Sequence, residues 1–459
     1  MVADPQETTG YSIISYDSGA ATRVLLTELS DGFSLPAHPH FEAAAINSFI
    51  QRSFGLDVIT LECFRESTQG LGAGGSRVFV HEIRTPPPAN FRHGAWLSAR
   101  DLTAVPFAVP EHRAVLRAWF EESASTECRG RRLPWARPGW FADASTWIAE
   151  RLVESGLSPT GRVQQVDSRL WSALLRVPTT AGGAYFKAVP PVFRHEPALT
   201  RLLGERFPAQ VPTVLAVDAE RGWMLTEDFG PESEYADTAE IVEAYTQVMP
   251  VLARMQVALA ADADKLVALG CPRRPAAVLP KLYEELLADT EMLYLDDPNG
   301  LGEDEYERLR KYVGEFTATT EQLAGAPIPE TLVHGDAWRG NFLSPRPGAG
   351  PLIFDWAESS VGHPFLTLAV VYRDVRESVP AEEAESAIVR IADAYLAEWT
   401  QFADESELRE ILRLSVTAGI VNRAIEWRNS VAELDPDRAM FYRYAVPVNL
   451  RRLLPFIAG

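Results

Sequence analysis

Two short apolar runs that each lead into polar residues constrain the fold of this chain more than any other feature. The run TLV leads into His334, Asp336 and Asn341, and the later run LIF leads into Asp355. Strands deliver functional side chains in this way, at the point where the apolar run ends. A loop of this kind could also carry Asp and Asn only to satisfy turn backbone. The second Asp, at the end of a second apolar run, favours a functional site.

The residue types in the two loops suit phosphoryl transfer to a hydroxyl. That reaction needs a carboxylate to orient or deprotonate the attacking hydroxyl, and hard oxygen ligands for the Mg²⁺ that bridges the nucleotide phosphates. Asp336 fits the first role, and Asn341 with Asp355 fits the second. His334 precedes the loop, and we expect it to be structural, hydrogen-bonded to backbone near Asp355.

HGDAWRGN together with FDW resembles the catalytic and metal-binding loops of the aminoglycoside phosphotransferase family. The resemblance covers roughly residues 150–459. It implies an α+β, two-lobed protein-kinase-like fold, with a small antiparallel-sheet lobe and a large helical lobe. It also implies an enzyme that uses ATP and Mg²⁺. Thr367 stands where the family usually carries an Asp that braces the catalytic loop.

The acceptor that the resemblance implies is a small molecule with a hydroxyl group. The catalytic loop lacks the Lys that Ser/Thr protein kinases carry two residues after the Asp, which points away from a protein substrate. An aminoglycoside, an amino sugar, another sugar and a choline-like alcohol all stay open. The candidate acceptor-binding residues include some that an ordinary packed or solvated helix face would also explain; they are Trp338, Arg339, Glu358, Glu426 and Trp427.

A kinase-like fold needs a Lys on an upstream strand, and AYFKAV supplies Lys187. The chain has only four lysines, so a Lys in an apolar strand favours a compact charge at the nucleotide phosphates. A surface Lys at a strand edge is the alternative. Glu196, at the start of the following helical pattern, is the expected ion-pair partner of Lys187.

Two further segments are expected to meet the nucleotide. The hairpin DSRLWS, at 167–172, is in the right place to overhang the phosphates, whereas the Gly-rich TTAGG reads as the next hairpin. WMLTEDFG, at 223–230, resembles the strand and hinge that join the lobes, where backbone would meet a purine edge. The residues expected to contact the nucleotide are Ser168, Ser172, Thr226, Glu227 and Asp228.

The first 121 residues resemble an α/β Nudix-like domain. GAWLSARDL matches the pattern W-[LV]-x-x-x-[DE]-L, and INSFIQRSFGLDV resembles the Nudix helix. Phe49, Arg52 and Ser53 occupy the three carboxylate positions of that helix, so the domain could not hold Mg²⁺ on a diphosphate. We therefore expect a structural or substrate-shaping cap, not a hydrolase.

A zinc site in this first region is the alternative that needs separate treatment. Period-two spacing would place two of the histidines on one strand face, but neighbouring prolines favour an irregular loop. The residues concerned are His38, His40, Glu42, His81 and His93.

The expected domain order follows from these segments. It comprises a degenerate Nudix-like domain at 1–121, a linker at 122–140, the small lobe at 141–228 and the helical lobe at 229–459. The linker is rich in Arg, Pro and small polar residues, which is typical of connecting segments. The main alternative function for this arrangement is a non-catalytic nucleotide-binding or scaffold protein.

The charge balance limits the partners. The chain has 43 Lys and Arg against 63 Asp and Glu, a net charge of -20 over 459 residues. This acidity excludes general binding to nucleic acid or an anionic membrane, because the field would repel a polyanion. A nucleotide can still bind, since Mg²⁺ and Lys187 reverse the sign locally. The acceptor is expected to be cationic or neutral.

Targeting and redox signals are absent from the sequence. MVADPQETTG has no apolar core of a signal peptide, and no apolar run approaches the roughly 18–20 residues that span a bilayer. Cys63, Cys128 and Cys271 form neither a disulfide framework nor a C-x-x-C pair. We expect a cytoplasmic protein.

Overall fold

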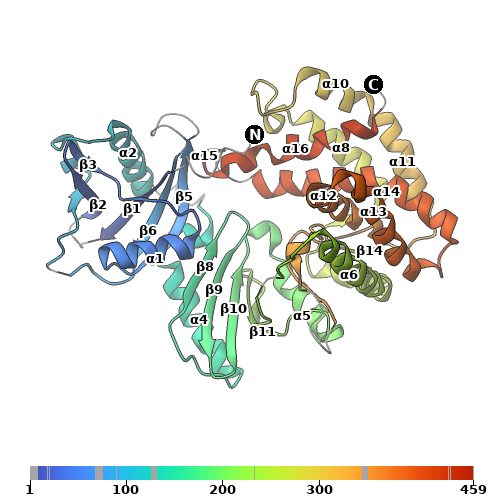
Figure 1. The fold of residues 1–459 in the computed structure, drawn as a ribbon, viewed down its shortest axis with the longest axis horizontal. Coiled ribbons are helices and arrows are strands. Elements are labelled where there is room, and N and C mark those ends of the chain that lie inside the picture. The colour runs from blue at the N-terminus through green and yellow to red at the C-terminus, as the bar shows by residue number, and fades with distance from the viewer. Residues whose placement is uncertain are drawn as a thin grey trace. The chain divides into compact units, whose positions relative to one another are not determined.

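The structure is a computed structural model of the chain, and it divides into two compact units. The first unit comprises Met1–Pro190 and Glu433–Met440, and the second comprises Pro191–Ala432 and Phe441–Gly459. Each unit is described by itself (Figure 1). Met1 to Thr8 and Cys128 lie outside the described residues, which are 9–17, 19, 21–67, 76–88, 90–125, 132–231, 233–343, 350–432, 434 and 436–457.

The first unit begins with a mixed sheet in the order β3-β2-β1-β6-β5, with β4 paired to β1 and β7 to β2. β1 and β6 run parallel, and the other pairs are antiparallel. Figure 1 shows α1 and α2 beside these strands. The bounds are β1 Thr9–Asp17, β2 Thr22–Leu29, β3 Gly32–Ser34, β4 Ala37–His38, α1 Ala43–Phe54, β5 Val58–Ser67, β6 Ser76–Ile83, β7 Ala95–Ser98 and α2 Pro110–Ala124.

The helix expected at INSFIQRSFGLDV is confirmed as α1. α1 covers the sheet with Ile46 and Ile50, which belong to one buried cluster with Ile14 and Leu25. α1 ends at Gly55, whose φ of 68° is a conformation that glycine adopts without steric cost. The resemblance to a Nudix domain itself stays a prediction.

Three further strands of the first unit, β8, β9 and β10, pair with one another in antiparallel fashion. Ser168 pairs with Ala173 and Gly182 pairs with Thr179, so both expected hairpins are confirmed. The rings of Trp140 and Trp147, on α4, lie 6.0 and 5.7 Å from the Phe186 ring of β10. The bounds are α4 Trp140–Glu154, β8 Gln164–Ser168, β9 Ala173–Thr179, β10 Gly182–Ala188 and α15 Pro436–Ala439.

The segment expected as a linker is packed where the structure describes it. Residues 126–131 lie outside the described residues, but Arg132, Trp135 and Ala136 are buried. Trp135 and Ala136 belong to a short 3₁₀ turn, η3 (Pro134–Ala136). The expected domain boundaries stay predictions.

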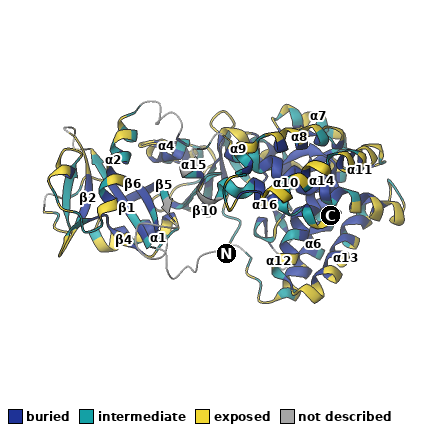
Figure 2. Ribbon diagram, turned by 90° about the horizontal axis from the view of Figure 1, so that it is seen from above, coloured by how far each residue is buried: buried dark blue, intermediate teal, exposed yellow. Residues whose placement is uncertain are grey.

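The second unit is mostly helical, as expected for the C-terminal part of an α+β chain. Its helices turn buried faces inward and exposed faces outward (Figure 2). The helices are α5 Glu196–Arg206, α6 Thr238–Leu259, α7 Ala263–Ala268, α8 Leu279–Ala288, α9 Thr290–Leu293, α10 Glu303–Lys311, α11 Val313–Gly325, α12 Leu368–Ser378, α13 Ala381–Leu396, α14 Glu405–Val431 and α16 Ala445–Arg451.

Short strands interrupt the helices and deliver the polar loops. β14 pairs with β17, which pairs with β13, and β15 pairs with β16. The predicted strand at Thr331–Val333 is confirmed as β14. The bounds of the others are β11 Val214–Asp218, β12 Trp223–Glu227, β13 Arg273–Arg274, β15 Phe342–Leu343, β16 Leu352–Ile353 and β17 Ser360–Gly362.

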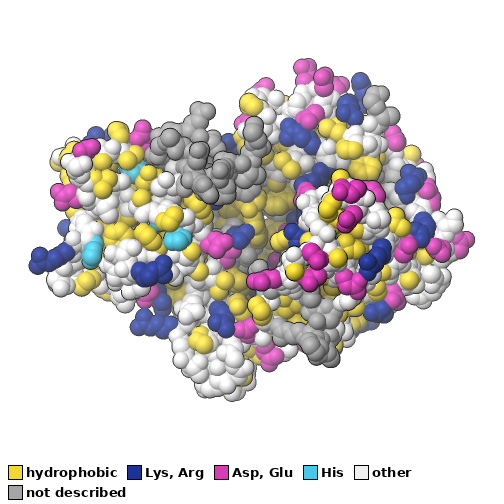
Figure 3. Space-filling model, in the orientation of Figure 1, with side chains coloured by type: hydrophobic (Ala, Val, Ile, Leu, Met, Phe, Trp, Pro, Cys, Tyr) yellow, Lys and Arg dark blue, Asp and Glu magenta, His cyan; other side chains and the backbone are white. Residues whose placement is uncertain are grey.

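Charged side chains of both signs are interspersed on the face drawn in Figure 3. In the part of the chain that the structure describes, no helix has the length and apolarity to cross a membrane.

The aromatic core of the helical unit predicts where it is most sensitive to substitution. Phe365 is fully buried, with ring centroids 5.5 Å from Tyr395 and 5.3 Å from Trp399. We expect Phe365→Ala to lower the free energy of unfolding by about 3–5 kcal/mol, because it leaves a cavity among rigid rings. Phe456→Ala is the control, with 43% of the side chain exposed and an expected loss below about 1 kcal/mol. Equal losses in chemical denaturation would contradict this description of the core.

Candidate active site

The catalytic loop begins with a turn that only glycine fits. Gly335 follows β14 and His334 with a φ of 81°, and a Cβ there would lie 2.1 Å from the Glu358 carbonyl oxygen. The loop then folds on itself, because the Trp338 amide donates to the Asp336 carbonyl at 2.9 Å and the Asn341 amide donates to the Trp338 carbonyl at 2.9 Å. This backbone arrangement presents the Asp336 side chain at a fixed place.

His334 is structural, as predicted. Its side chain is fully buried, and its Nε2 donates to the Phe354 carbonyl oxygen at 3.1 Å, next to Asp355. Its ring lies 4.5 Å from the Trp356 ring. Burial lowers the pKa of His334, so the imidazole is neutral at physiological pH. The residue therefore ties the two polar loops together.

Thr367 braces the catalytic loop, although the family usually has an Asp at this position. Its Oγ1 accepts from the His334 amide at 3.4 Å and from Gln256 Nε2 at 3.3 Å. Gln256 also donates to the Leu332 carbonyl at 2.8 Å and accepts from the Tyr395 hydroxyl at 2.6 Å. All of these groups are buried. A hydroxyl and an amide thus hold the strand that a carboxylate would otherwise hold.

The β15–β16 hairpin brings Asn341 and Asp355 together. Phe342 pairs with Ile353, so the residues on either side of this pair, Asn341 and Phe354, are adjacent, and the Phe354 amide donates to the Asn341 carbonyl at 3.1 Å. Asp355 then turns sharply with a φ of 63°. A non-glycine residue in the left-handed region costs roughly 1–2 kcal/mol, which the surrounding packing has to offset.

The oxygen atoms near this turn fit a magnesium ion. Asn341 Nδ2 donates to the Asp336 carbonyl at 2.8 Å, which leaves its amide oxygen as a ligand. Asp355 would supply a carboxylate, and water would complete the coordination that Mg²⁺ prefers. No group of three or more His, Cys, Asp and Glu side chains that could hold a metal occurs among the described residues. The roles of Asn341 and Asp355 as metal ligands stay predictions.

Arg423, on α14, forms an ion pair with Asp336. Its Nη2 lies 2.8 Å from Asp336 Oδ1, while Asn341 Nδ2 lies 3.4 Å from Oδ2. Both carboxylate oxygens of Asp336 thus have a donor. Only 7% of the Arg423 side chain and 16% of the Asp336 side chain are exposed, so solvent screens this pair weakly.

The same guanidinium contacts two further carboxylates, which were candidate acceptor-binding residues. Arg423 Nη1 lies 3.4 Å from Glu358 and 3.4 Å from Glu426, and Arg274 lies 3.3 Å from Glu426. Asn422 also donates to Glu426 at 3.0 Å. We call the cluster of Asp336, Glu358, Glu426, Arg274 and Arg423 the carboxylate–arginine cluster.

Together, burial and the neighbouring charges raise the pKa of Glu358, Glu426 and Arg423. Burial, followed by the charge of Asp336, raises the pKa of Glu358 well above its usual range, although Arg423 opposes the shift. Burial also raises the pKa of Glu426, against Arg274 and Arg423. Burial opposes the charge on Arg423, but the carboxylates outweigh it and raise the pKa of Arg423. Arg423 therefore stays charged.

The sequence indicated Glu426 and Trp427, on the same helix, but not Arg423. The signal was its setting, because the neighbouring positions Ile420, Val421, Ala424 and Ile425 are apolar and buried on α14. An arginine in such a helix is rarely buried without a partner. The identity of the partner could not be read from the helix.

The remaining candidate acceptor-binding residues differ in the contacts that their side chains make. Arg339 contacts Asp374 at 2.6 Å and also Ser378, so its charge is used against α12. Trp338 is 37% exposed. The Trp427 ring stacks on Tyr442 at 5.7 Å and lies under the Arg423 guanidinium at 5.3 Å. Their roles in binding stay predictions.

The residues expected to contact the nucleotide lie in both units. In the first unit Lys187 is on β10 opposite Leu174. Ser168 Oγ donates to the Leu61 carbonyl at 3.3 Å, and the Ser172 carbonyl accepts from the Arg169 amide at 2.8 Å.

In the second unit Glu196 is fully buried at the start of α5. Thr226 pairs with Val214, the Glu227 amide donates to the Thr213 carbonyl at 3.0 Å, and Asp228 accepts from the Gly230 amide at 3.0 Å. The pairing of Lys187 with Glu196 stays a prediction.

The histidines of the first unit have structural roles where the structure describes their contacts. His81 is fully buried between Ser12 at 2.9 Å and Thr60 at 3.1 Å. His38 Nδ1 accepts from the His40 amide at 3.3 Å. These hydrogen bonds favour structural roles for His81 and His38 over zinc ligation.

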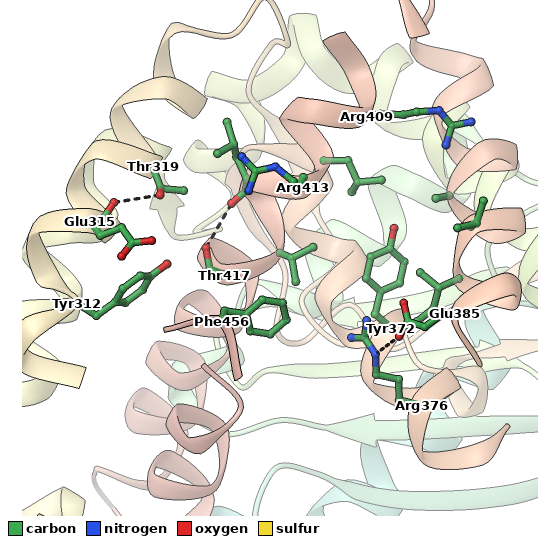
Figure 4. Close-up of a pocket in the computed structure, with 16 residues that line it drawn as sticks. Tyr312, Glu315, Thr319, Tyr372, Arg376, Glu385, Arg409, Arg413, Thr417 and Phe456 are labelled. Atoms are coloured by element: carbon green, nitrogen blue, oxygen red, sulfur yellow. Dashed lines mark hydrogen bonds and ion pairs between the residues drawn. The ribbon is translucent and has the colours of Figure 1, made fainter. Parts of the chain in front are cut away.

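A separate pocket of about 420 Å³ lies in the helical unit, among α11, α12, α13 and α14. Figure 4 shows Tyr372 and Arg376 on one side and Tyr312 and Thr417 on the other. None of the predicted site residues lines it.

Comparison with known proteins bears on the fold and the family. Solved structures similar to this chain include a macrolide 2'-phosphotransferase from Brachybacterium faecium, with 15% identity over 67% of this chain and 98% of that chain and a TM-score of 0.45. A choline/ethanolamine kinase family protein from Mesorhizobium loti has 16% identity over 68% and 94% of the two chains, with a TM-score of 0.46. A spectinomycin phosphotransferase in complex with ADP and spectinomycin has 10% identity over 67% and 94%, with a TM-score of 0.39.

A search of curated protein sequences gives no match. The model of the phosphotransferase enzyme family matches residues 149–410, which is more than half of the 459 residues. The match includes both polar loops and the bracing residue Thr367. The chain therefore belongs to the phosphotransferase enzyme family.

Proposed function

We propose that this protein is a small-molecule kinase that transfers the γ-phosphate of ATP to a hydroxyl of an aminoglycoside, an amino sugar or another sugar. One observation carries the proposal. Asp336 is held through both carboxylate oxygens, by Arg423 and Asn341, at the start of the loop that Asn341 and Asp355 complete. A carboxylate held in this way can accept a hydroxyl proton without first reorganising.

Each residue of the loop has one role in the proposal. Asp336 orients the acceptor hydroxyl and takes its proton. The Asn341 amide oxygen and the Asp355 carboxylate hold Mg²⁺, which when bound neutralises charge on the transferring phosphoryl group. His334 and Thr367 keep the loop in register. Lys187, Glu196 and the backbone at 226–228 are proposed to hold the nucleotide.

The carboxylate–arginine cluster bears on the charge of the acceptor. Glu358 and Glu426 each contact Arg423, and Glu426 also contacts Arg274. A cationic acceptor would have to compete with these guanidinium groups for the carboxylates. A neutral sugar hydroxyl needs only the free lone pairs of Asp336. We therefore propose a neutral acceptor group next to Asp336, with any positive charge placed farther away.

A non-catalytic nucleotide-binding protein is the second candidate. It shares the fold but predicts no ADP release with any acceptor. A panel of sugars, aminoglycosides and amino alcohols, assayed by ADP production, separates the two. Turnover with one acceptor supports the kinase, and silence with all of them, despite measured ATP binding, supports the alternative.

Asp336→Asn tests the base. We expect ADP release with the identified acceptor to fall by about 10²–10⁴-fold, because the amide cannot take the proton. The Kd for Mg²⁺-ATP, measured by calorimetry, should stay close to that of the unsubstituted protein. Asp264→Asn is the control, since 93% of its side chain is exposed. Retained turnover in Asp336→Asn would exclude the mechanism.

Asp355 substitutions test the metal site. We expect Asp355→Ala to lose the Mg²⁺-dependent part of ATP affinity, measured as the ratio of Kd with and without Mg²⁺. Asp355→Gly separates ligand loss from backbone strain, because glycine adopts the left-handed φ of 63° without steric cost while it removes the carboxylate. Both variants should lose the Mg²⁺ dependence. If only the alanine variant loses it, backbone conformation and not ligation is responsible.

Arg423 substitutions test the positioning of Asp336. We expect Arg423→Ala to lower kcat by about 100-fold, since a carboxylate displaced by about 1 Å loses alignment with the acceptor. The pH–rate profile should move to higher pH, because Glu358 and Glu426 lose the positive partner that lowers their pKa. Guanidinium ion added to the assay should restore part of kcat.

Arg413→Ala, on the same helix with 68% of its side chain exposed, should change neither quantity. Arg423→Lys keeps the positive charge but lacks the planar guanidinium. Its kcat should therefore lie between those of Arg423→Ala and Arg413→Ala. An unchanged pH profile in Arg423→Ala would show that this arginine is structural only.

A further inference from the structure

The chain before the family region is bonded to the first hairpin of β8–β9. We propose that β5 and the η3 turn are a positioning element that fixes the hairpin loop 168–172 and thereby raises affinity for the nucleotide. The inference rests on the proposed function, in which this loop overhangs the phosphates. All of the residues concerned belong to the first unit.

Gln165, on β8, is inserted into the N-terminal sheet like a short piece of strand. Its Oε1 accepts from the Thr60 amide at 2.9 Å, and its Nε2 donates to the Thr60 carbonyl at 2.7 Å. Asn47, on α1, also donates to Oε1 at 2.8 Å. Gln165 is 7% exposed, so water does not compete for these bonds. One side chain thus satisfies the backbone of β5 in the way that a neighbouring strand would.

Two more bonds hold the loop that follows β8. Ser168 Oγ donates to the Leu61 carbonyl at 3.3 Å, one residue along β5 from Thr60. Trp135 Nε1, in the η3 turn, donates to the Arg169 carbonyl at 2.9 Å. The loop is therefore attached at its first two residues to two segments that precede residue 149, where the family match begins.

The composition of the loop explains why such attachment matters. DSRLWS contains no glycine, so its backbone lacks the freedom that lets a Gly-rich loop settle around phosphates. The loop is closed internally by the Arg169 amide, which donates to the Ser172 carbonyl at 2.8 Å. A loop that cannot adapt gains affinity only if its conformation is already the bound one.

The supporting strand is itself held by buried polar contacts. Thr60 Oγ1 donates to Asn47 at 2.8 Å and lies 3.1 Å from His81. Glu62, two residues along β5, lies between Arg132 at 3.5 Å and Arg438 at 2.8 Å. These partners come from α1, β6, the segment before η3 and α15. The strand therefore cannot shift alone, which suits a fixed support.

Trp135→Phe and Gln165→Met test the inference, because the first keeps an aromatic ring, the second keeps side-chain volume, and neither residue is assigned to nucleotide contact. We expect faster hydrogen exchange at the amides of residues 169–172 in both variants. We also expect Kd for Mg²⁺-ATP, measured by calorimetry, to rise roughly three- to tenfold. Combining the two substitutions should increase both effects.

Thr146→Val is the control. It removes the exposed hydroxyl bond to the Ala142 carbonyl on α4 and leaves every bond among β5, the η3 turn and the hairpin in place. Its exchange at 169–172 and its Kd for Mg²⁺-ATP should match those of the unsubstituted protein.

The outcomes separate this inference from the proposed function. Unchanged loop exchange in Trp135→Phe and Gln165→Met overturns the positioning element, whatever the nucleotide affinity. Faster exchange with unchanged Kd overturns the link to the nucleotide. Failure of the unsubstituted protein to bind Mg²⁺-ATP overturns the proposed function instead, since the exchange measurement does not depend on it.

Discussion

The buried guanidinium of Arg423 is the contact on which the site depends. Three carboxyl groups, those of Asp336, Glu358 and Glu426, lie around it with little solvent, and their ionised forms would repel one another without a cation. The same ion pair that makes this burial tolerable also sets the direction of the Asp336 carboxylate. The stability of the cluster and the orientation of Asp336 are therefore coupled, because the charge of Arg423 both offsets the cost of burial and sets the direction of the Asp336 side chain. A rigid anion in a protected place is what proton transfer from a hydroxyl requires.

A second constraint is that buried contacts from the helical core fix the strand that leads into the catalytic loop. Thr367 accepts the His334 amide, and Gln256 connects this hydroxyl to Leu332 and to the Tyr395 hydroxyl. Every member is buried and the bonds are mutually supporting, so the strand β14 is held in one register. The position that usually carries a carboxylate can therefore carry a hydroxyl, since the amide of Gln256 supplies the additional bonds.

Much of this arrangement could be predicted from local sequence. The β8–β9–β10 hairpins follow from alternating apolar residues and turn residues, and the structural role of His334 follows from its place between two loops. The glycine at 335 and the pairing of Asn341 with the segment before Asp355 are also local, because one short hairpin connects them. By contrast, the composition of 122–140 suggested a connection and did not indicate that Trp135 is buried and bonded to the Arg169 carbonyl. Composition averages over the polar neighbours and does not record the contacts of one large side chain.

The sequence by itself predicted the chemistry that we propose for the loop, with an acid for the base role and an amide and an acid for magnesium, and it indicated the family, which the family match confirms. These residues act within short segments, so their spacing carries the information. Only the tertiary structure decided what holds them. Arg423, Gln256 and Gln165 reach partners far away in the chain, and burial makes each of those partners obligatory, because an unpaired charge or amide in the interior is costly. Which donor meets which acceptor is a property of packing, and no local pattern records it.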